Sequence, residues 1–123
     1  MDNDFIKIAV VGSRTFNNYN FLCEILNKYK ENIFLIVSGG AKGADSLGEK
    51  WANENNIKTL IIRPDWEKHG RAAGFIRNKD IVDESDIVIA FWNQTSKGTK
   101  NTIDYAIKQN KLGELHFFKE NDE

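Results

Sequence analysis

Residues 33–45 read IFLIVSGGAKGAD, an unbroken apolar run followed by a glycine-rich turn. An extended segment that is apolar on both faces is typical of a strand inside a parallel sheet covered by helices. Beyond the turn, Ala44, Leu47, Trp51 and Ala52 repeat at the spacing of one helix face. This segment therefore predicts a strand, a tight turn and an amphipathic helix in succession.

The same pattern recurs along the chain. Further apolar runs lie at residues 5–11, 57–62, 87–92 and, more weakly, 115–118. Stretches with helical character separate them, at residues 21–29, 72–84 and 103–107. The alternation predicts one α/β domain, a Rossmann-like, doubly wound fold of about five mostly parallel strands with helices on both faces. We expect this domain to span residues 1–118 and residues 119–123 to form a frayed tail.

The composition narrows the environments and partners to be expected. The 123 residues carry 17 basic and 18 acidic side chains, a formal net charge of −1. Such a balance provides no broad positive field for DNA or an anionic membrane, so neither is an expected partner, although it leaves room for a local basic cluster. No apolar run approaches the roughly 18 residues of a membrane span. The single Cys23 excludes an internal disulfide, and the acidic start at residues 1–4 is unlike a signal peptide, so we expect a cytoplasmic protein.

Metal and cofactor chemistry is not indicated. His69 and His116 have no metal-ligand spacing with each other or with Cys23. The glycine-rich turn is not a P-loop, and no G-x-G-x-x-G dinucleotide motif occurs in the chain. We therefore expect neither a metal nor a cofactor.

The arginines are distributed unlike the lysines. Ligands of open parallel sheets bind beyond the carboxyl ends of the strands, which are here residues 12–14, 38–45, 63–78 and 93–102. These segments contain all four arginines, whereas the thirteen lysines are scattered along the chain. A guanidinium grips phosphate with two parallel hydrogen bonds, so this clustering favours an anion site. The alternatives are accidental clustering, or arginines that anchor strand ends and pair with helices.

Small residues and aromatic rings share these segments. Backbone N–H groups of glycine turns are suited to phosphate, and an aromatic plane is suited to a base. Asp45 has three interpretations, a hydrogen-bond partner of a ribose, a base or a helix cap, and Thr99 is either a cap or a phosphate contact. The candidate ligand-binding residues are Gly12, Ser13, Arg14, Ser38, Gly39, Gly40, Gly43, Asp45, Trp66, Arg71, Arg77, Asn78, Trp92, Gly98 and Thr99.

Several of these segments match a known group of proteins. The matching pieces are Gly12-Ser13-Arg14, residues 39–45 (GGAKGAD), Pro64-Asp65-Trp66, residues 70–74 (GRAAG), Arg77-Asn78 and Gly98-Thr99. Together they make the chain resemble the SLOG superfamily of Rossmann-like nucleotide-binding domains, most closely its YspA-related branch. The resemblance implies a nucleotide or nucleotide-derived ligand at the carboxyl ends of the strands, and often a homodimer or higher homo-oligomer.

The resemblance suggests three functions. Our first expectation is binding of a small nucleotide-like molecule, related to NAD, ADP-ribose or a cyclic nucleotide, by a sensor or a sequestering protein in phage–bacterium conflict. The alternative is an enzyme that hydrolyses or transfers N-glycosidic bonds, with Asp45 as its tentative catalytic carboxylate. In the superfamily's phosphoribohydrolases, the motif P-G-G-x-G-T-x-x-E supplies a catalytic Glu, but Thr102 stands at that position here, which argues against hydrolysis. The second alternative is binding of single-stranded nucleic acid, as in a DNA-processing branch, which the net charge disfavours.

Overall fold

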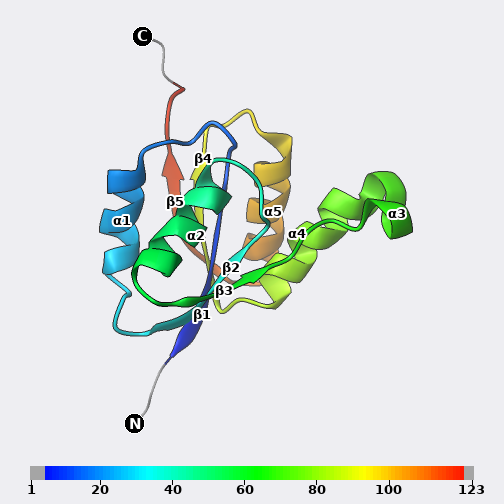
Figure 1. Ribbon diagram of the computed structural model, residues 1–123. Helices are drawn as coiled ribbons and strands as arrows, with labels where there is room; N and C mark the ends of the chain where they lie inside the picture. Colours follow the sequence, from blue (N-terminus) through cyan, green and yellow to red (C-terminus); the bar gives the residue numbers. More distant parts are fainter. Residues whose placement is uncertain (1–4, 121–123) are drawn as a thin grey trace.

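The computed structural model describes residues 5–120 (Figure 1). Its strands are β1 (Ile6–Gly12), β2 (Ile33–Ser38), β3 (Lys58–Ile61), β4 (Ile87–Trp92) and β5 (Leu112–Phe117). Its helices are α1 (Tyr19–Asn27), α2 (Ala44–Glu54), α3 (Trp66–His69), α4 (Ala73–Asp83) and α5 (Lys97–Lys108), with a 3-10 turn at Gly70–Ala72 between α3 and α4. The expected single Rossmann-like α/β domain is confirmed.

The five strands form one parallel sheet in the order β3-β2-β1-β4-β5. The central strand β1 pairs with β2 on one side and with β4 on the other, so the order reverses there. At such a reversal the loops that follow the two neighbouring strands run to opposite faces of the sheet, which leaves a crevice at their carboxyl ends. The topology therefore places a binding crevice beside the ends of β1 and β4.

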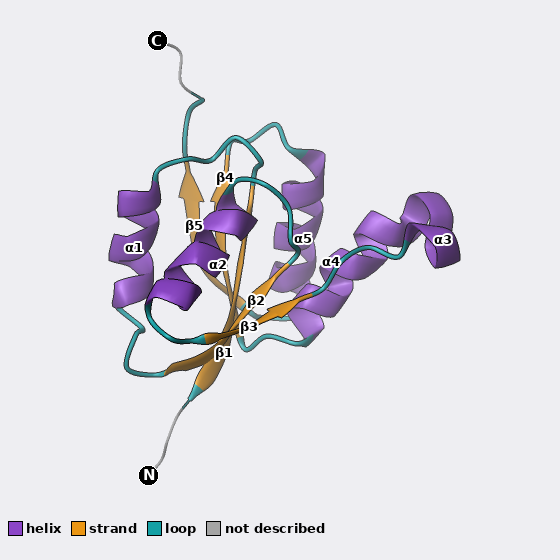
Figure 2. Ribbon diagram, in the orientation of Figure 1, coloured by secondary structure: helices purple, strands orange, loops and turns teal. Residues whose placement is uncertain are grey.

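Helices cover both faces of the sheet (Figure 2). On one face α1 and α2 pack over the first core cluster, in which Trp51 is 1% exposed, as its place in the apolar stripe predicts. On the other face, Ile81 and Val82 of α4 and Ile103 of α5 join the second cluster. Burial on both faces explains why the strands read as continuous apolar runs.

Two strand boundaries differ from the sequence expectation. β5 begins at Leu112 and not at residue 115. The sequence pattern missed its first residues because Gly113 and Glu114 interrupt the apolar run, and the pairing of β4 with β5 shifts its register in this region. β3 is limited to Lys58–Ile61 and is mostly exposed, since it forms one edge of the sheet. The short helix α3 was not expected from the sequence.

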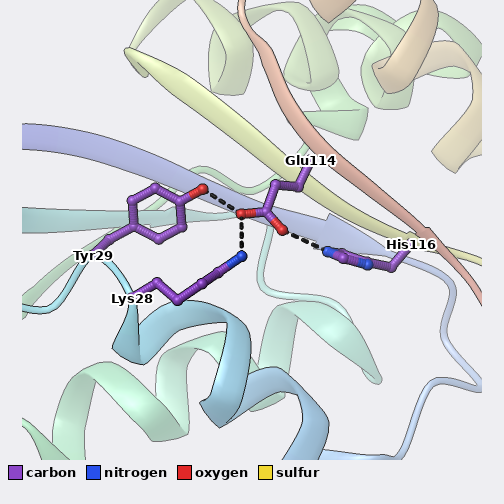
Figure 3. A network of polar contacts seen from close by, with 4 residues as sticks. All are labelled: Lys28, Tyr29, Glu114 and His116. Atoms are coloured by element: carbon purple, nitrogen blue, oxygen red, sulfur yellow. Dashed lines mark hydrogen bonds and ion pairs between the residues drawn. The ribbon is translucent and has the colours of Figure 1, made fainter.

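A polar cluster ties the opposite edge strand, β5, to the end of α1 (Figure 3). Glu114 of β5 accepts hydrogen bonds from the Tyr29 hydroxyl and, at 2.9 Å, from the Lys28 ammonium. Nε2 of His116 lies 2.7 Å from the other carboxylate oxygen of Glu114. The cluster fixes the edge strand to the helical layer beside it.

The ends of the chain are described in part. Residues 1–4 and 121–123, which include the acidic start and most of the predicted tail, lie outside the described residues. At Glu120 the carboxylate accepts hydrogen bonds from Thr15 and Asn93, so this part of the tail contacts the domain. None of the helices within residues 5–120 is long and apolar enough to cross a membrane.

Candidate functional site

A cleft of about 290 Å³ opens at the carboxyl ends of the strands. Its wall includes the end of β1, the start of α2, the first turns of α4 and α5, and α3. This is the crevice that the strand order predicts. The candidate residues that line it are Gly12, Arg14, Asp45, Trp66, Arg71, Arg77, Asn78, Gly98 and Thr99.

The other candidates lie behind the wall of the cleft. Ser13 is buried, and its hydroxyl accepts a hydrogen bond from the Asn93 N–H at 3.1 Å. The buried Ser38 hydroxyl donates to Glu49 at 2.6 Å. The indole N–H of Trp92 donates to the Ser96 carbonyl at 3.0 Å. Gly39, Gly40 and Gly43 form the turn before α2 and do not line the cleft.

The N–H groups of the glycine turn are already used within the protein. Those of Gly39 and Ala41 donate to one carboxylate oxygen of Asp45, at 3.1 and 3.2 Å. The Gly40 N–H donates to the Ser38 hydroxyl at 3.1 Å. Because these donors have partners, the turn offers them to a ligand only if the internal bonds break. Asp45 thus holds the preceding turn in place.

Arg77 supports the same turn from α4. One of its guanidinium nitrogens donates to the Gly39 carbonyl at 2.7 Å, and Nε donates to the Asn78 side chain at 3.1 Å. Burial lowers the pKa of Arg77, while the charge of Asp45 raises it. Arg77 therefore joins α4 to the end of β2 and leaves only part of its guanidinium for a ligand.

Burial raises the pKa of Asp45 to about 6. The Ala41 N–H, the charge of Arg77 and the Gly39 N–H oppose this rise, and the charge of Glu49 adds to it. The desolvation of the charged form is thus only partly compensated by its partners. A carboxyl group with this pKa changes charge near neutral pH, inside the wall of the cleft.

Asn78 braces the opposite wall. Its side chain is buried, and the amide nitrogen donates to the Gly98 carbonyl at 3.3 Å and to the Asn101 side chain at 3.0 Å. These bonds connect α4 to the first turn of α5. Thr99, on the same turn, is buried, and its hydroxyl lies 2.9 Å from that of the helix cap Ser96.

Arg14 and Arg71 differ from Arg77. Both are exposed and line the cleft, Arg14 after β1 and Arg71 on the 3-10 turn. Within residues 5–120 no hydrogen bond or ion pair engages either guanidinium. A positive group without a protein partner keeps its donors for an anion from solution. These two side chains are therefore the cationic groups that the cleft presents to a ligand.

Two aromatic side chains stand on the α3–α4 side of the cleft. Trp66 on α3 is 60% exposed and Phe75 on α4 is 54% exposed, and both line the cleft. Trp66 is among the sequence candidates, whereas Phe75 was missed. The irregular apolar spacing of residues 72–84 was its one signal, because an aromatic residue outside the stripe of a helix points away from the core. Among the described residues, no group of three or more His, Cys, Asp or Glu side chains is placed to hold a metal ion.

Comparisons with known proteins identify a matching family and a relative of similar length. Residues 6–69 match the model of the YspA, cpYpsA-related SLOG family. The chain is 30% identical over 112 residues to the Gene 61 protein of Mycobacterium phage D29, across 83% of this chain and 89% of that protein.

Two solved structures share the fold. DNA processing protein A from Streptococcus pneumoniae superposes with a TM-score of 0.74 at 21% identity, over 89% of this chain and 50% of that one, so this chain spans half its length. DNA processing protein A from Helicobacter pylori, described for its single-stranded DNA binding mode, superposes with a TM-score of 0.72 at 20% identity, over 95% of this chain and 68% of that one.

These comparisons correct two expectations from the sequence. A small nucleotide-like molecule as ligand and nucleic acid as an unlikely partner are both wrong, because the matching structures are DNA-processing proteins and one is described with single-stranded DNA. These structures favour the second alternative from the sequence over the first expectation. The error came from the net charge of −1, which averages over the whole surface. Binding depends on the local field, and the described cleft concentrates arginines. The fold, the matched segment and the phage relative together show that the chain belongs to the YspA, cpYpsA-related SLOG family.

Proposed function

We propose that the protein binds single-stranded DNA in the cleft at the carboxyl ends of its strands. The observation that carries this proposal is the pair of exposed arginines, Arg14 and Arg71, which line the cleft and have no partner among residues 5–120. Phosphate contacts from such groups provide most of the affinity of single-strand binders. The fold shared with DNA processing protein A supports the proposal.

The internal bonds of the site fit a polymer that lies across the cleft. The walls of the cleft are cross-linked by hydrogen bonds of Asp45, Arg77 and Asn78, which make them rigid. Contacts with a ligand are therefore left to the side chains at the rim. A backbone of repeated phosphates reaches separated arginines without entering the glycine turn. A cytoplasmic location is part of this proposal, since the free Cys23 suits a reducing compartment.

Fluorescence anisotropy with a labelled 20-nucleotide single strand tests the proposal. We expect binding that weakens steeply as salt rises, because counterions are released from the phosphates. Arg14→Gln and Arg71→Gln should each weaken binding and lower the slope of log K against log salt by about 1. Lys58→Gln is the matched control, because Lys58 is exposed at the amino end of β3, away from the cleft.

Two results would contradict this function. One is the absence of binding at low salt by protein that circular dichroism shows to be folded. The other is binding that Arg14→Gln and Arg71→Gln leave as strong as Lys58→Gln does, which would place the strand elsewhere on the surface.

A further inference from the structure

The segment that carries α3 and the 3-10 turn buries none of its own residues. We call residues 65–75 the arm; they comprise α3, the 3-10 turn and the first residues of α4, and in Figure 1 α3 stands out from the sheet beyond the start of α4. Trp66 and Phe75, one near each end of the arm, are both more than half exposed. Exposed rings of this size are unfavourable in water, and Ala73 is the one residue of the arm that is buried.

The arm holds its tryptophan in a defined place. The Asp65 carboxylate accepts a hydrogen bond from the Lys68 N–H at 3.1 Å and so caps α3. Gly70, with a φ of +56°, turns the chain back toward α4. At Gly74 an added Cβ would lie 3.8 Å from the Cη2 atom of Trp66, so the indole rests on the first turn of α4. That position is one residue from Phe75.

The aromatic pair shares its cleft with the unengaged arginines. Arg71 lies within the arm and Arg14 lies on the loop after β1, and both line the cleft. The other exposed phenylalanines, Phe5, Phe34 and Phe117, do not line the cleft. Cations beside apolar rings complement a ligand in which negative phosphates alternate with flat aromatic groups.

We propose that Trp66 and Phe75 form a stacking surface for an unpaired base, while Arg14 and Arg71 hold the phosphates on either side of it. The substrate class is then a nucleic-acid strand whose bases are free to leave the stack, and duplex is excluded because its base faces are covered. Every base has a π face, so the surface tolerates any sequence, with purines favoured by their larger rings. This inference rests on the proposed function of the cleft.

The test separates bases from phosphates. Two labelled 12-nucleotide strands are compared, one of deoxyadenosine throughout and one whose central four nucleotides are abasic, so that the number of phosphates is unchanged. Wild-type protein should bind the abasic strand about 5- to 150-fold more weakly, the effect of removing one stacking interaction. Trp66→Ala should bind the intact strand more weakly than wild type does and lose most of the preference for it over the abasic strand.

Matched variants exclude a loss of fold. Trp66→Phe keeps an aromatic plane and should retain most of the preference for the intact strand. Phe75→Ala should act in the same direction as Trp66→Ala. Phe34→Ala removes an exposed ring from β2, outside the cleft, and should bind like wild type.

Tryptophan emission provides a second readout. Trp51 is 1% exposed and Trp92 is partly buried, whereas Trp66 is 60% exposed. Stacking of a base should quench the emission of Trp66, so the quenching by the intact strand should disappear in Trp66→Phe.

The possible failures are distinguishable. If folded protein binds neither strand, the proposed function falls and this inference falls with it. If binding depends on the arginines but intact and abasic strands bind equally, and Trp66→Ala changes nothing, the stacking surface is refuted while DNA binding stands.

Discussion

The buried surroundings of Asp45 disfavour the charged form of its carboxyl group. Burial raises its pKa to about 6, above the ordinary value of 3.8, although two N–H groups and Arg77 stabilise the charged form. The folded protein therefore binds a proton at Asp45 more tightly than the unfolded chain does. The resulting contribution to stability is present at low pH and is lost as the pH rises through about 6.

Replacement of Asp45 by Asn should remove this pH dependence. Between pH 4 and 7 the wild-type protein should lose up to about 3 kcal/mol of unfolding free energy relative to Asp45→Asn, since each pKa unit corresponds to about 1.4 kcal/mol. Urea denaturation at several pH values measures the difference. Asp80→Asn, at an exposed position of α4, is the control. Parallel pH profiles of wild type and Asp45→Asn would show that Asp45 does not titrate in this range.

Two constraints require a glycine at position 43, the backbone conformation and the lack of space for a side chain. Its φ is +79°, and an added Cβ would lie 2.4 Å from the Ser13 carbonyl oxygen. Gly43→Ala should therefore destabilise the fold by at least about 2 kcal/mol, because the turn before α2 must move. Gly98, in the first turn of α5, has open space around it, so Gly98→Ala should leave stability unchanged or raise it slightly. Thermal unfolding of the two variants compares them, and equal melting temperatures would contradict the close approach at Gly43.

At the scale of elements, β5 depends on one carboxylate for its attachment to α1. Partial burial raises the pKa of Glu114, but the donors on Tyr29, Lys28 and His116 outweigh it and the pKa lies below its ordinary value (Figure 3). The same cluster raises the pKa of Tyr29 to about 12, through burial and the bond to Glu114. The stabilisation by Glu114 is thus present above its ordinary pKa of 4.5 and is lost as the pH falls through the lower, folded value.

Glu114→Gln should loosen this edge strand. At pH 7 we expect the free energy of unfolding to fall by about 1–3 kcal/mol, because the substitution removes the charge that strengthens all the hydrogen bonds to this side chain. The difference from wild type should shrink in acid, where Glu114 is protonated. Chemical denaturation at pH 7 and pH 3 measures both values, with the exposed Glu84→Gln as control. A difference that does not change with pH would assign the effect to packing and not to charge.

At the scale of the whole molecule, the two core clusters share one sheet and should unfold together. The predicted domain boundary at residue 118 has a direct test. A chain that ends at Phe118 should keep one cooperative transition, because Phe118 still donates its N–H to the Trp92 carbonyl while Glu120 contributes only exposed contacts. Circular dichroism and Trp51 emission should give the same midpoint. Two separate transitions, or no transition, would place the boundary farther along the chain.

The amino-acid sequence determined the fold class and the edge of the sheet where the site lies. Continuous apolar runs that alternate with helical stripes permit few arrangements, and the carboxyl ends of parallel strands must share one edge. That is why the arginines and glycines could be assigned to one region before any coordinates. The family was also recognisable, because its motifs are local in the chain.

Only the tertiary structure decided which of those residues line the cleft. Gly39 and Gly40 share an edge with Arg14 in the sequence pattern, yet their N–H groups point to Asp45 and Ser38, and Trp92 lies behind the wall. These partners lie only two to six residues away in the sequence, but the direction in which an N–H group or an indole ring points is set by the folded backbone and not by the order of residues. The same holds for charge: a chain with a net charge of −1 presents two unengaged arginines and two exposed rings in one cleft. Composition is a sum over the chain, whereas binding depends on the few side chains that folding brings together at one surface.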